Sequence, residues 1–157
     1  NLLNRTSSMS RKWFNNMVPA KTNIGNDDFL ESYSSKTVIN YIKHFDLYEL
    51  DLAANEILEF AIKTNLYLNE KQPWILIKDN NNISIVSNII YNVLESTRII
   101  GLLLLPLLPD LSKKIDYQLG SLYMQDKSWK EQLDWGLLKQ ETKLPPPDPI
   151  INKLEYE

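Results

Sequence analysis

The longest apolar stretch of the chain covers residues 83–105 and reads ISIVSNIIYNVLESTRIIGLLLL. Its apolar side chains recur at steps of three and four residues, which is the spacing of one face of an α-helix. The side chains that define the pattern are Ile85, Ile89, Ile90, Val93, Leu94 and Ile100. The stretch therefore predicts a long helix in the centre of the core. The helix should end near Pro106, because a proline inside a helix removes a hydrogen bond and disrupts it.

Amphipathic helices are also predicted upstream of this core helix. Residues 1–16 repeat apolar side chains at helical steps, and Pro19 follows the end of that pattern. A loop without apolar periodicity comes next. Asp27 or Asp28 can then cap a second helix that should run to about His44, because a short acidic side chain accepts hydrogen bonds from the free N–H groups of a first turn.

A third helix is expected to begin after Asp46, with Glu49 three residues further on in capping-box spacing. Its apolar stripe is predicted to be Leu50, Ala54, Ile57, Ala61 and Leu68. Asn65 lies on the same stripe, and burying an amide is costly unless it is hydrogen-bonded. We expect Asn65 either to bond the loop that follows or to orient Trp74.

The chain after the third helix is predicted to be helical in shorter pieces. Pro73 suits the first turn of a short helix, because its missing N–H costs nothing there. Residues 110–119 form another short helical pattern. The mixed segment 121–141 is expected to pack on the bundle through Trp129 and Trp135.

A proline-rich segment closes the sequence. Residues 144–149 read LPPPDP, and they cannot be helical because successive prolines fix φ and remove hydrogen-bond donors. No repeat and no alternating strand pattern interrupts the helical signals. The fold class is therefore predicted to be all-α, with a helical bundle domain over residues 1–143 and a Pro-rich C-terminal strap over residues 144–157.

Composition limits the kinds of chemistry that the chain can carry. At 157 residues with 43% hydrophobic and 24% charged residues, it has the make-up of one ordinary globular domain. The apolar run 99–108 is too short to cross a membrane, which needs about 20 residues, so no membrane partner is expected. With no cysteine and one histidine, His44, the common zinc sites are excluded and a reducing compartment is compatible.

Charge is distributed unevenly along the chain. The net charge of −3 argues against coating of nucleic acid through bulk electrostatics, and DNA is not an expected partner. However, no acid precedes Asp27, whereas Arg5, Arg11, Lys12 and Lys21 are all basic. A local positive surface near the N-terminus is therefore predicted on an otherwise acidic domain.

Asn1 and Arg5 stand four residues apart, so a helix that begins this early projects both side chains from one face. Their donors and acceptors suit the Watson–Crick edge of an unpaired base. Trp74, directly after Pro73, is a candidate stacking platform for that base. The structural alternatives are a solvated helix start for the polar pair and a core position for the indole. No phosphate loop, nucleophile motif or histidine cluster is present, so no catalytic residue is predicted.

Four sequence words, taken in order, resemble the anticodon-binding domain of methionyl-tRNA synthetases. They are NLLNR at residues 1–5, AIKTNLY at 61–67, QPWILIK at 72–78 and LPLLP at 105–109. The closing words PDPIINKLE, at 147–155, resemble the strap that in this family returns toward the catalytic domain.

The resemblance implies roles for individual residues. It implies that Asn1 and Arg5 contact the cytosine that opens the CAU anticodon of tRNA-Met, that Trp74 stacks on it, and that Asn65, Tyr67 and Pro73 support the site. It also implies a cytoplasmic methionine-tRNA ligase. Activation of methionine with ATP and Mg²⁺ would belong to a separate catalytic domain that contacts this one, with no cofactor in these residues.

Two other interpretations remain open at this point. One is the anticodon domain of a related class I synthetase, such as those for cysteine, leucine or valine. The other is a helical protein-interaction module without an RNA role, which predicts a buried Trp74 and a salt-bridged Arg5. The RNA interpretation predicts instead that Asn1, Arg5 and Trp74 converge on one exposed patch.

Overall fold

A computed structural model describes residues 1–22, 24, 27–120, 123–124, 126–148 and 150–151. The helices follow in the order α1 (Leu2–Trp13), α2 (Phe29–Asp46), α3 (Leu50–Lys71), α4 (Pro73–Leu76), the 3₁₀ helix η1 (Asn80–Asn82), α5 (Ile83–Leu104), α6 (Pro109–Gln118) and the 3₁₀ helix η2 (Glu131–Leu133). The described residues contain no strand and only one isolated β-bridge, between Met17 and Lys143. The predicted all-α fold is confirmed.

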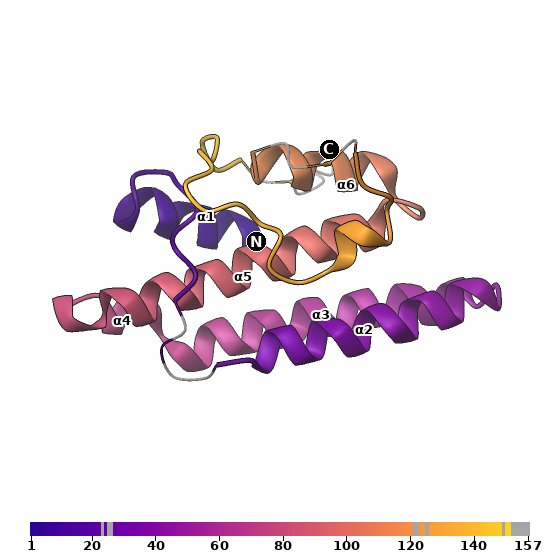
Figure 1. Cartoon of the computed structure of the whole chain (residues 1–157), viewed down its shortest axis with the longest axis horizontal. Helices are drawn as coiled ribbons and strands as arrows, with labels where there is room; N and C mark the ends of the chain where they lie inside the picture. Colours follow the sequence, from indigo (N-terminus) through magenta and orange to yellow (C-terminus); the bar gives the residue numbers. More distant parts are fainter. Residues whose placement is uncertain (23, 25–26, 121–122, 125, 149, 152–157) are drawn as a thin grey trace, which may run out of the picture.

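The helices lie in three layers (Figure 1). The hairpin of α2 and α3 packs on one side of α5, and α1 and α6 cover the other side. Because α5 has neighbours on both sides, every residue from Val86 to Leu103 is buried. The prediction of a central core helix is confirmed. None of the helices in the described ranges is long and apolar enough to span a membrane.

A buried ion pair ties the segment after α6 to the middle of α5. The Arg98 guanidinium donates to both carboxylate oxygens of Glu95, at 2.7 and 2.8 Å, and the two side chains are 5% and 0% exposed. Arg98 also donates to two backbone carbonyls, those of Gln132 and Asp134. Glu95 accepts three backbone N–H groups, those of Gly136, Leu137 and Leu138. This network holds in place a mostly irregular segment in which η2 is the one helix of the described residues.

Close packing holds α6 on α5. A Cβ atom added at Gly101 would lie 2.8 Å from Cγ2 of Ile115, so a larger residue there would push the helices apart. The Ser112 hydroxyl donates to the Gly101 carbonyl at 2.6 Å across the same contact. Trp129 also packs on the bundle as predicted, and its indole N–H donates to the carbonyl of Leu102.

The predicted start of α3 was wrong. Asp46 is the last residue of α2, and Glu49 occupies the N-cap position without a side-chain capping bond. The Glu49 carboxylate lies 2.7 Å from Nδ1 of His44 instead. The turn between the helices therefore closes through Tyr48, whose φ of 60° is left-handed, and through a side-chain contact with the preceding helix.

The predicted buried stripe of α3 was partly wrong. Leu50 is 47% exposed, and Ala54 is exposed too. The buried positions are Ala53, Ile57, Phe60, Thr64, Tyr67 and Leu68. Because α3 contacts both α2 and α5, its buried face points between these two neighbours rather than along its most aliphatic stripe.

Asp28 occupies the N-cap of α2, but neither predicted cap makes a side-chain capping bond. The Asp27 carboxylate accepts a hydrogen bond from the Tyr67 hydroxyl at 2.9 Å and pairs with Lys71 at 2.8 Å. Phe29, the first residue of α2, is 48% exposed, although its ring stacks on that of Tyr67. The start of α2 is thus fixed by contacts with α3.

The first part of the strap, residues 144–148, is not helical, as predicted. It packs on this domain, since Leu144 is buried and its N–H donates to the Asn16 carbonyl at 2.6 Å. Further along, the Asp148 N–H donates to the Gln118 side chain of α6. Residues 149 and 152–157 lie outside the described ranges.

Candidate functional site

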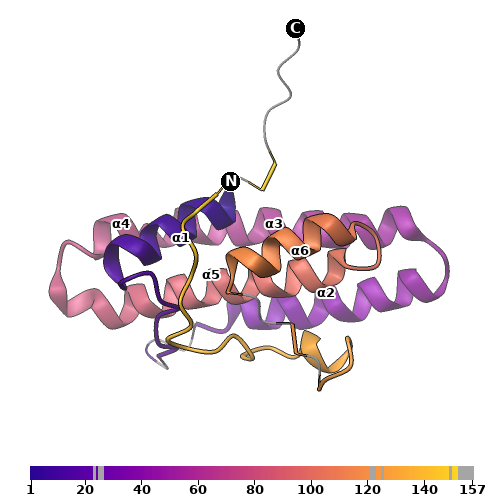
Figure 2. The same cartoon turned by 90° about the horizontal axis from the view of Figure 1, so that it is seen from above.

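Contacts of Arg5 join the N-terminal half of α1 to the C-terminal part of α3 and to the short α4. Figure 2 shows α4 at one end of the long axis, with α1 running toward that end. Arg5 of α1 donates to the side-chain carbonyls of Asn65, at 3.5 Å, and Asn69, at 3.2 Å. Its guanidinium carbon lies 5.8 Å from the centre of the Trp74 ring, a separation typical of cation–π contacts. Three of the predicted site residues therefore come together, from separate helices.

The turn between α3 and α4 presents Trp74 at the surface. Gln72 adopts a left-handed conformation with φ of 47°, which ends α3, and Pro73 is the first residue of α4, as predicted. Pro73 is buried, whereas Trp74 is 36% exposed. The chain thus anchors this corner through the proline ring and leaves part of the indole open to solvent.

Asn1 precedes α1 by one residue and is exposed. Its backbone carbonyl accepts the Arg5 N–H at 3.0 Å, and its side chain makes no capping bond. The structure thus places Asn1 one turn before Arg5, at the exposed start of α1.

Asn65 is half-buried, and its bond to Arg5 differs from the predicted bond to the following loop. Asn69 was not predicted from the sequence. The signal that could have found it is its four-residue spacing from Asn65, which puts both amides on one face of α3.

Tyr67 points to a different part of the molecule. Its hydroxyl donates to Asp27 and lies 3.5 Å from the side-chain nitrogen of Asn92, and its ring contacts Phe29. Burial raises the pKa of Tyr67, so the hydroxyl keeps its proton and remains a donor. These contacts stabilise the packing of α2 on α3 rather than the Arg5–Trp74 contact.

The cluster of Arg5, Asn65, Asn69 and Trp74 leaves a positive charge open to a ligand. The two acceptors that hold Arg5 are neutral amides, and Arg5 has no ion-pair partner in the described part of the chain. A guanidinium has five N–H donors, and these two bonds leave the others free to reach a ligand. The site can therefore offer a rigid fork of donors next to an exposed aromatic surface.

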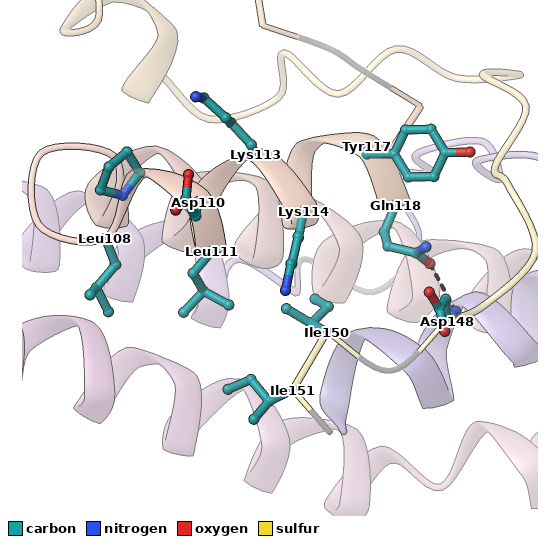
Figure 3. Close-up of a pocket in the computed structure, with 11 residues that line it drawn as sticks. Leu108, Asp110, Leu111, Lys113, Lys114, Tyr117, Gln118, Asp148, Ile150 and Ile151 are labelled. Carbon is teal, nitrogen blue, oxygen red and sulfur yellow. Dashed lines mark hydrogen bonds between the residues drawn. The ribbon is translucent and has the colours of Figure 1, made fainter. Parts of the chain in front are cut away.

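A large cavity lies elsewhere, between α6 and the strap (Figure 3). It has a volume of about 880 Å³ and is lined by apolar side chains, among them Leu108, Leu111, Ile150 and Ile151, with Lys113 and Lys114 on α6. Within the described ranges, no three His, Cys, Asp or Glu side chains are placed to hold a metal ion. The cavity is an open, mostly apolar groove whose charged lining residues are two lysines and two aspartates, Asp110 and Asp148.

Comparison with known proteins places this geometry in context. Residues 18–157 match the family model described as the anticodon binding domain of methionyl tRNA ligase. Methionine–tRNA ligase 1 of Bacillus cereus is 32% identical over 159 aligned residues, which cover 100% of this chain and 24% of that protein. The methionine–tRNA ligase of Thermotoga maritima is also 32% identical, over 99% of this chain and 24% of its own length.

Solved structures agree with the sequence relatives. The free form of Mycobacterium tuberculosis methionyl-tRNA synthetase superposes with a TM-score of 0.89 at 26% identity, over 100% of this chain and 32% of that one. The chain thus spans about a quarter of the length of the curated relatives it matches. The family model begins after α1, whereas the alignment with the B. cereus protein covers α1 as well.

Proposed function

The chain belongs to the family of the anticodon-binding domain of methionyl-tRNA ligases, and from this premise we propose that it binds the anticodon loop of tRNA-Met and reads its CAU anticodon. The observation that supports this proposal most directly is the Arg5 guanidinium, held by Asn65 and Asn69 at 5.8 Å from the exposed Trp74 ring. The chemistry of these groups matches an unpaired cytosine.

Cytosine presents two acceptors, O2 and N3, next to an exocyclic amine that donates. The Arg5 fork donates to the two acceptors, and the Asn1 side-chain carbonyl accepts from the amine. Uracil has a donor at N3 and an acceptor at the exocyclic position, so it presents the wrong pattern at two atoms. Trp74 supplies the stacking surface, which contributes about 1–3 kcal/mol per base.

The rival interpretation as a protein-interaction module predicts a buried Trp74 and a salt-bridged Arg5. Trp74 is 36% exposed, and Arg5 bonds neutral amides. Both observations favour a ligand with a flat face and hydrogen-bond acceptors, which an RNA base provides.

The whole protein is proposed to be a cytoplasmic methionine-tRNA ligase that activates methionine with ATP and Mg²⁺ in a catalytic domain. Support comes from the names of the relatives and from their length, about four times that of this chain. The strap and the apolar groove beside Leu111 and Ile150 are the surface proposed to contact that domain. An uncovered apolar surface of this kind is typical of a contact between domains.

The test is a binding titration of the 157-residue chain with two anticodon stem-loops, one bearing CAU and one bearing UAU. We expect the CAU stem-loop to bind at least about tenfold more tightly, since a matched bidentate contact contributes about 1–3 kcal/mol of discrimination. In Arg5→Lys, which loses the fork but keeps the charge, the preference should fall to about twofold.

Arg11→Lys makes the same chemical change six residues further along α1 and serves as the matched control, with the preference for CAU retained. Equal affinity of the unmodified chain for the two stem-loops would contradict the proposed function.

A further inference from the structure

The C-terminal half of α1 carries positive side chains that take no part in the contacts of Arg5. Arg11 and Lys12 lie in the last turn of α1 and are exposed. Neither forms an ion pair with any residue that the structure describes. Lys21, by contrast, pairs with Glu31 at 3.5 Å. Two unpaired cations therefore stand together on a domain whose net charge is −3.

A third cation reaches the same place from the far end of the sequence. Lys143 pairs with Met17 in the isolated antiparallel bridge, which is held by the hydrogen bond from the Val18 N–H to the Thr142 carbonyl at 2.9 Å. Opposite residues of such a bridge project to the same side. Lys143 is exposed and thus adds to the positive charge at the end of α1.

Arg11 and Lys12 lie on the same helix as Arg5, which belongs to the proposed base-reading cluster of Arg5, Asn65, Asn69 and Trp74. Asn1, Arg5, Ser8 and Lys12 follow one another at steps of four, three and four residues, so they form one stripe along α1. Seven residues separate Arg5 from Lys12, which is about 10 Å along a helix. An RNA strand whose base reaches Arg5 and Trp74 can therefore pass over Lys12 within a few nucleotides.

We infer that Arg11, Lys12 and Lys143 form a phosphate-binding track that holds the RNA backbone next to the base-reading cluster. The inference rests on the proposed function and adds a second set of contacts to it. The track contacts only phosphates, which are the same in every sequence, so it raises affinity and fixes register without selecting a base. Unpaired cations suit this role because no internal salt bridge has to be broken first.

The test measures how binding of the CAU stem-loop to the 157-residue chain depends on salt. Each phosphate contact contributes about 0.7–0.9 to the slope of log K against log salt concentration. In Arg11→Gln/Lys12→Gln we expect binding at low salt to weaken about tenfold and the slope to fall by about 1.5, with the ratio of CAU to UAU affinity unchanged. Adding Lys143→Gln should lower the slope further.

The matched control is Lys36→Gln/Lys43→Gln, which removes the same charge from exposed positions of α2 on the opposite side of α5 (Figure 1). This variant should bind with the unmodified slope. Equal slopes for the two double variants would overturn the inference, because the effect would then be one of net charge alone. The inference would also be overturned if Arg11→Gln/Lys12→Gln left RNA binding unchanged but weakened binding to vesicles of phosphatidylserine.

The two proposals fail separately in this design. If the chain binds the CAU and UAU stem-loops equally, the proposed function is contradicted. The inferred track still stands in that case if the salt slope depends on Arg11 and Lys12. If the chain prefers the CAU stem-loop but the substitutions of Arg11 and Lys12 leave the salt slope unchanged, the track is contradicted and the proposed function stands. Failure to bind either stem-loop at low salt overturns both.

Discussion

Two arginines show how one side chain serves two purposes in this domain. Arg98 is 5% exposed, and four hydrogen bonds of 2.5–2.8 Å join it to Glu95 and to backbone carbonyls. Arg5 is half-buried and makes two bonds, of 3.2 and 3.5 Å, to neutral amides. One guanidinium is nearly saturated inside the protein, whereas the other keeps donors and charge for a partner.

The difference follows from the acceptors that the fold provides. A carboxylate neutralises a guanidinium and fits its fork in a bidentate pair, which offsets the cost of burial. Amide oxygens orient the group without neutralising it, so its electrostatic attraction to an anionic ligand remains. The fold therefore pairs Arg98 with a carboxylate where a fixed structure is needed, and holds Arg5 with neutral acceptors where a site stays open.

Glu95→Ala should have the largest effect, because it removes the buried carboxylate that pairs with Arg98. The substitution leaves the Arg98 charge buried and unpaired and removes the acceptor of three backbone N–H groups. We expect a loss of about 3–5 kcal/mol in the free energy of unfolding and a Tm lower by about 10 °C, measured by urea and thermal unfolding. Glu59→Ala, at an exposed position of α3, is the control and should change little. A stability equal to that of the unmodified chain would show that the buried pair is dispensable.

Trp74→Ala should affect RNA binding at the Arg5 cluster, with a smaller change in free energy than Glu95→Ala causes in stability. Loss of the stacking surface should weaken binding of the CAU stem-loop by about 1–3 kcal/mol, roughly 5- to 150-fold. The Tm should change far less than in Glu95→Ala, because Trp74 is already 36% exposed. Trp74→Phe keeps an aromatic face and should retain most of the affinity. Weakening in proportion to lost stability would argue that the indole acts in folding alone.

Asn65→Ala and Asn69→Ala should have the smallest effects, because they loosen Arg5 without removing it. The bonds from Arg5 are long and partly exposed, so each contributes about 0.5–1.5 kcal/mol. Each variant should bind the CAU stem-loop roughly 2- to 12-fold more weakly, with a Tm within about 5 °C of that of the unmodified chain. Asn55→Ala, at an exposed position on the same helix, is the control. If both variants bound as the unmodified chain does, the amides would not position Arg5.

Local patterns predicted most of the helices because helical periodicity and proline act over a few residues. The core helix, the position of Pro73 and the non-helical strap were all predicted in this way. The start of α3 was missed because Glu49 bonds His44 rather than capping its own helix. That competing contact depends on how the turn folds, which the spacing of acidic residues does not show.

The candidate site was predicted in part for a related reason. Arg5, Asn65 and Trp74 were singled out separately, and the structure brings them together. Asn69 was missed, because its importance lies in a bond to Arg5 across 64 residues of sequence. The placement of Tyr67 beside Asp27 rather than at the cluster was equally hidden.

By itself, the sequence determined the fold class, the limits of the core helix and the kinds of side chain available for binding, because these depend on composition and on spacing within a few turns. The tertiary structure alone decided which side chains meet. It brought Lys143 to the end of α1 and Arg5 to the amides of α3. The physical reason is that contacts between helices depend on the crossing of whole elements, which periodicity within one helix does not encode.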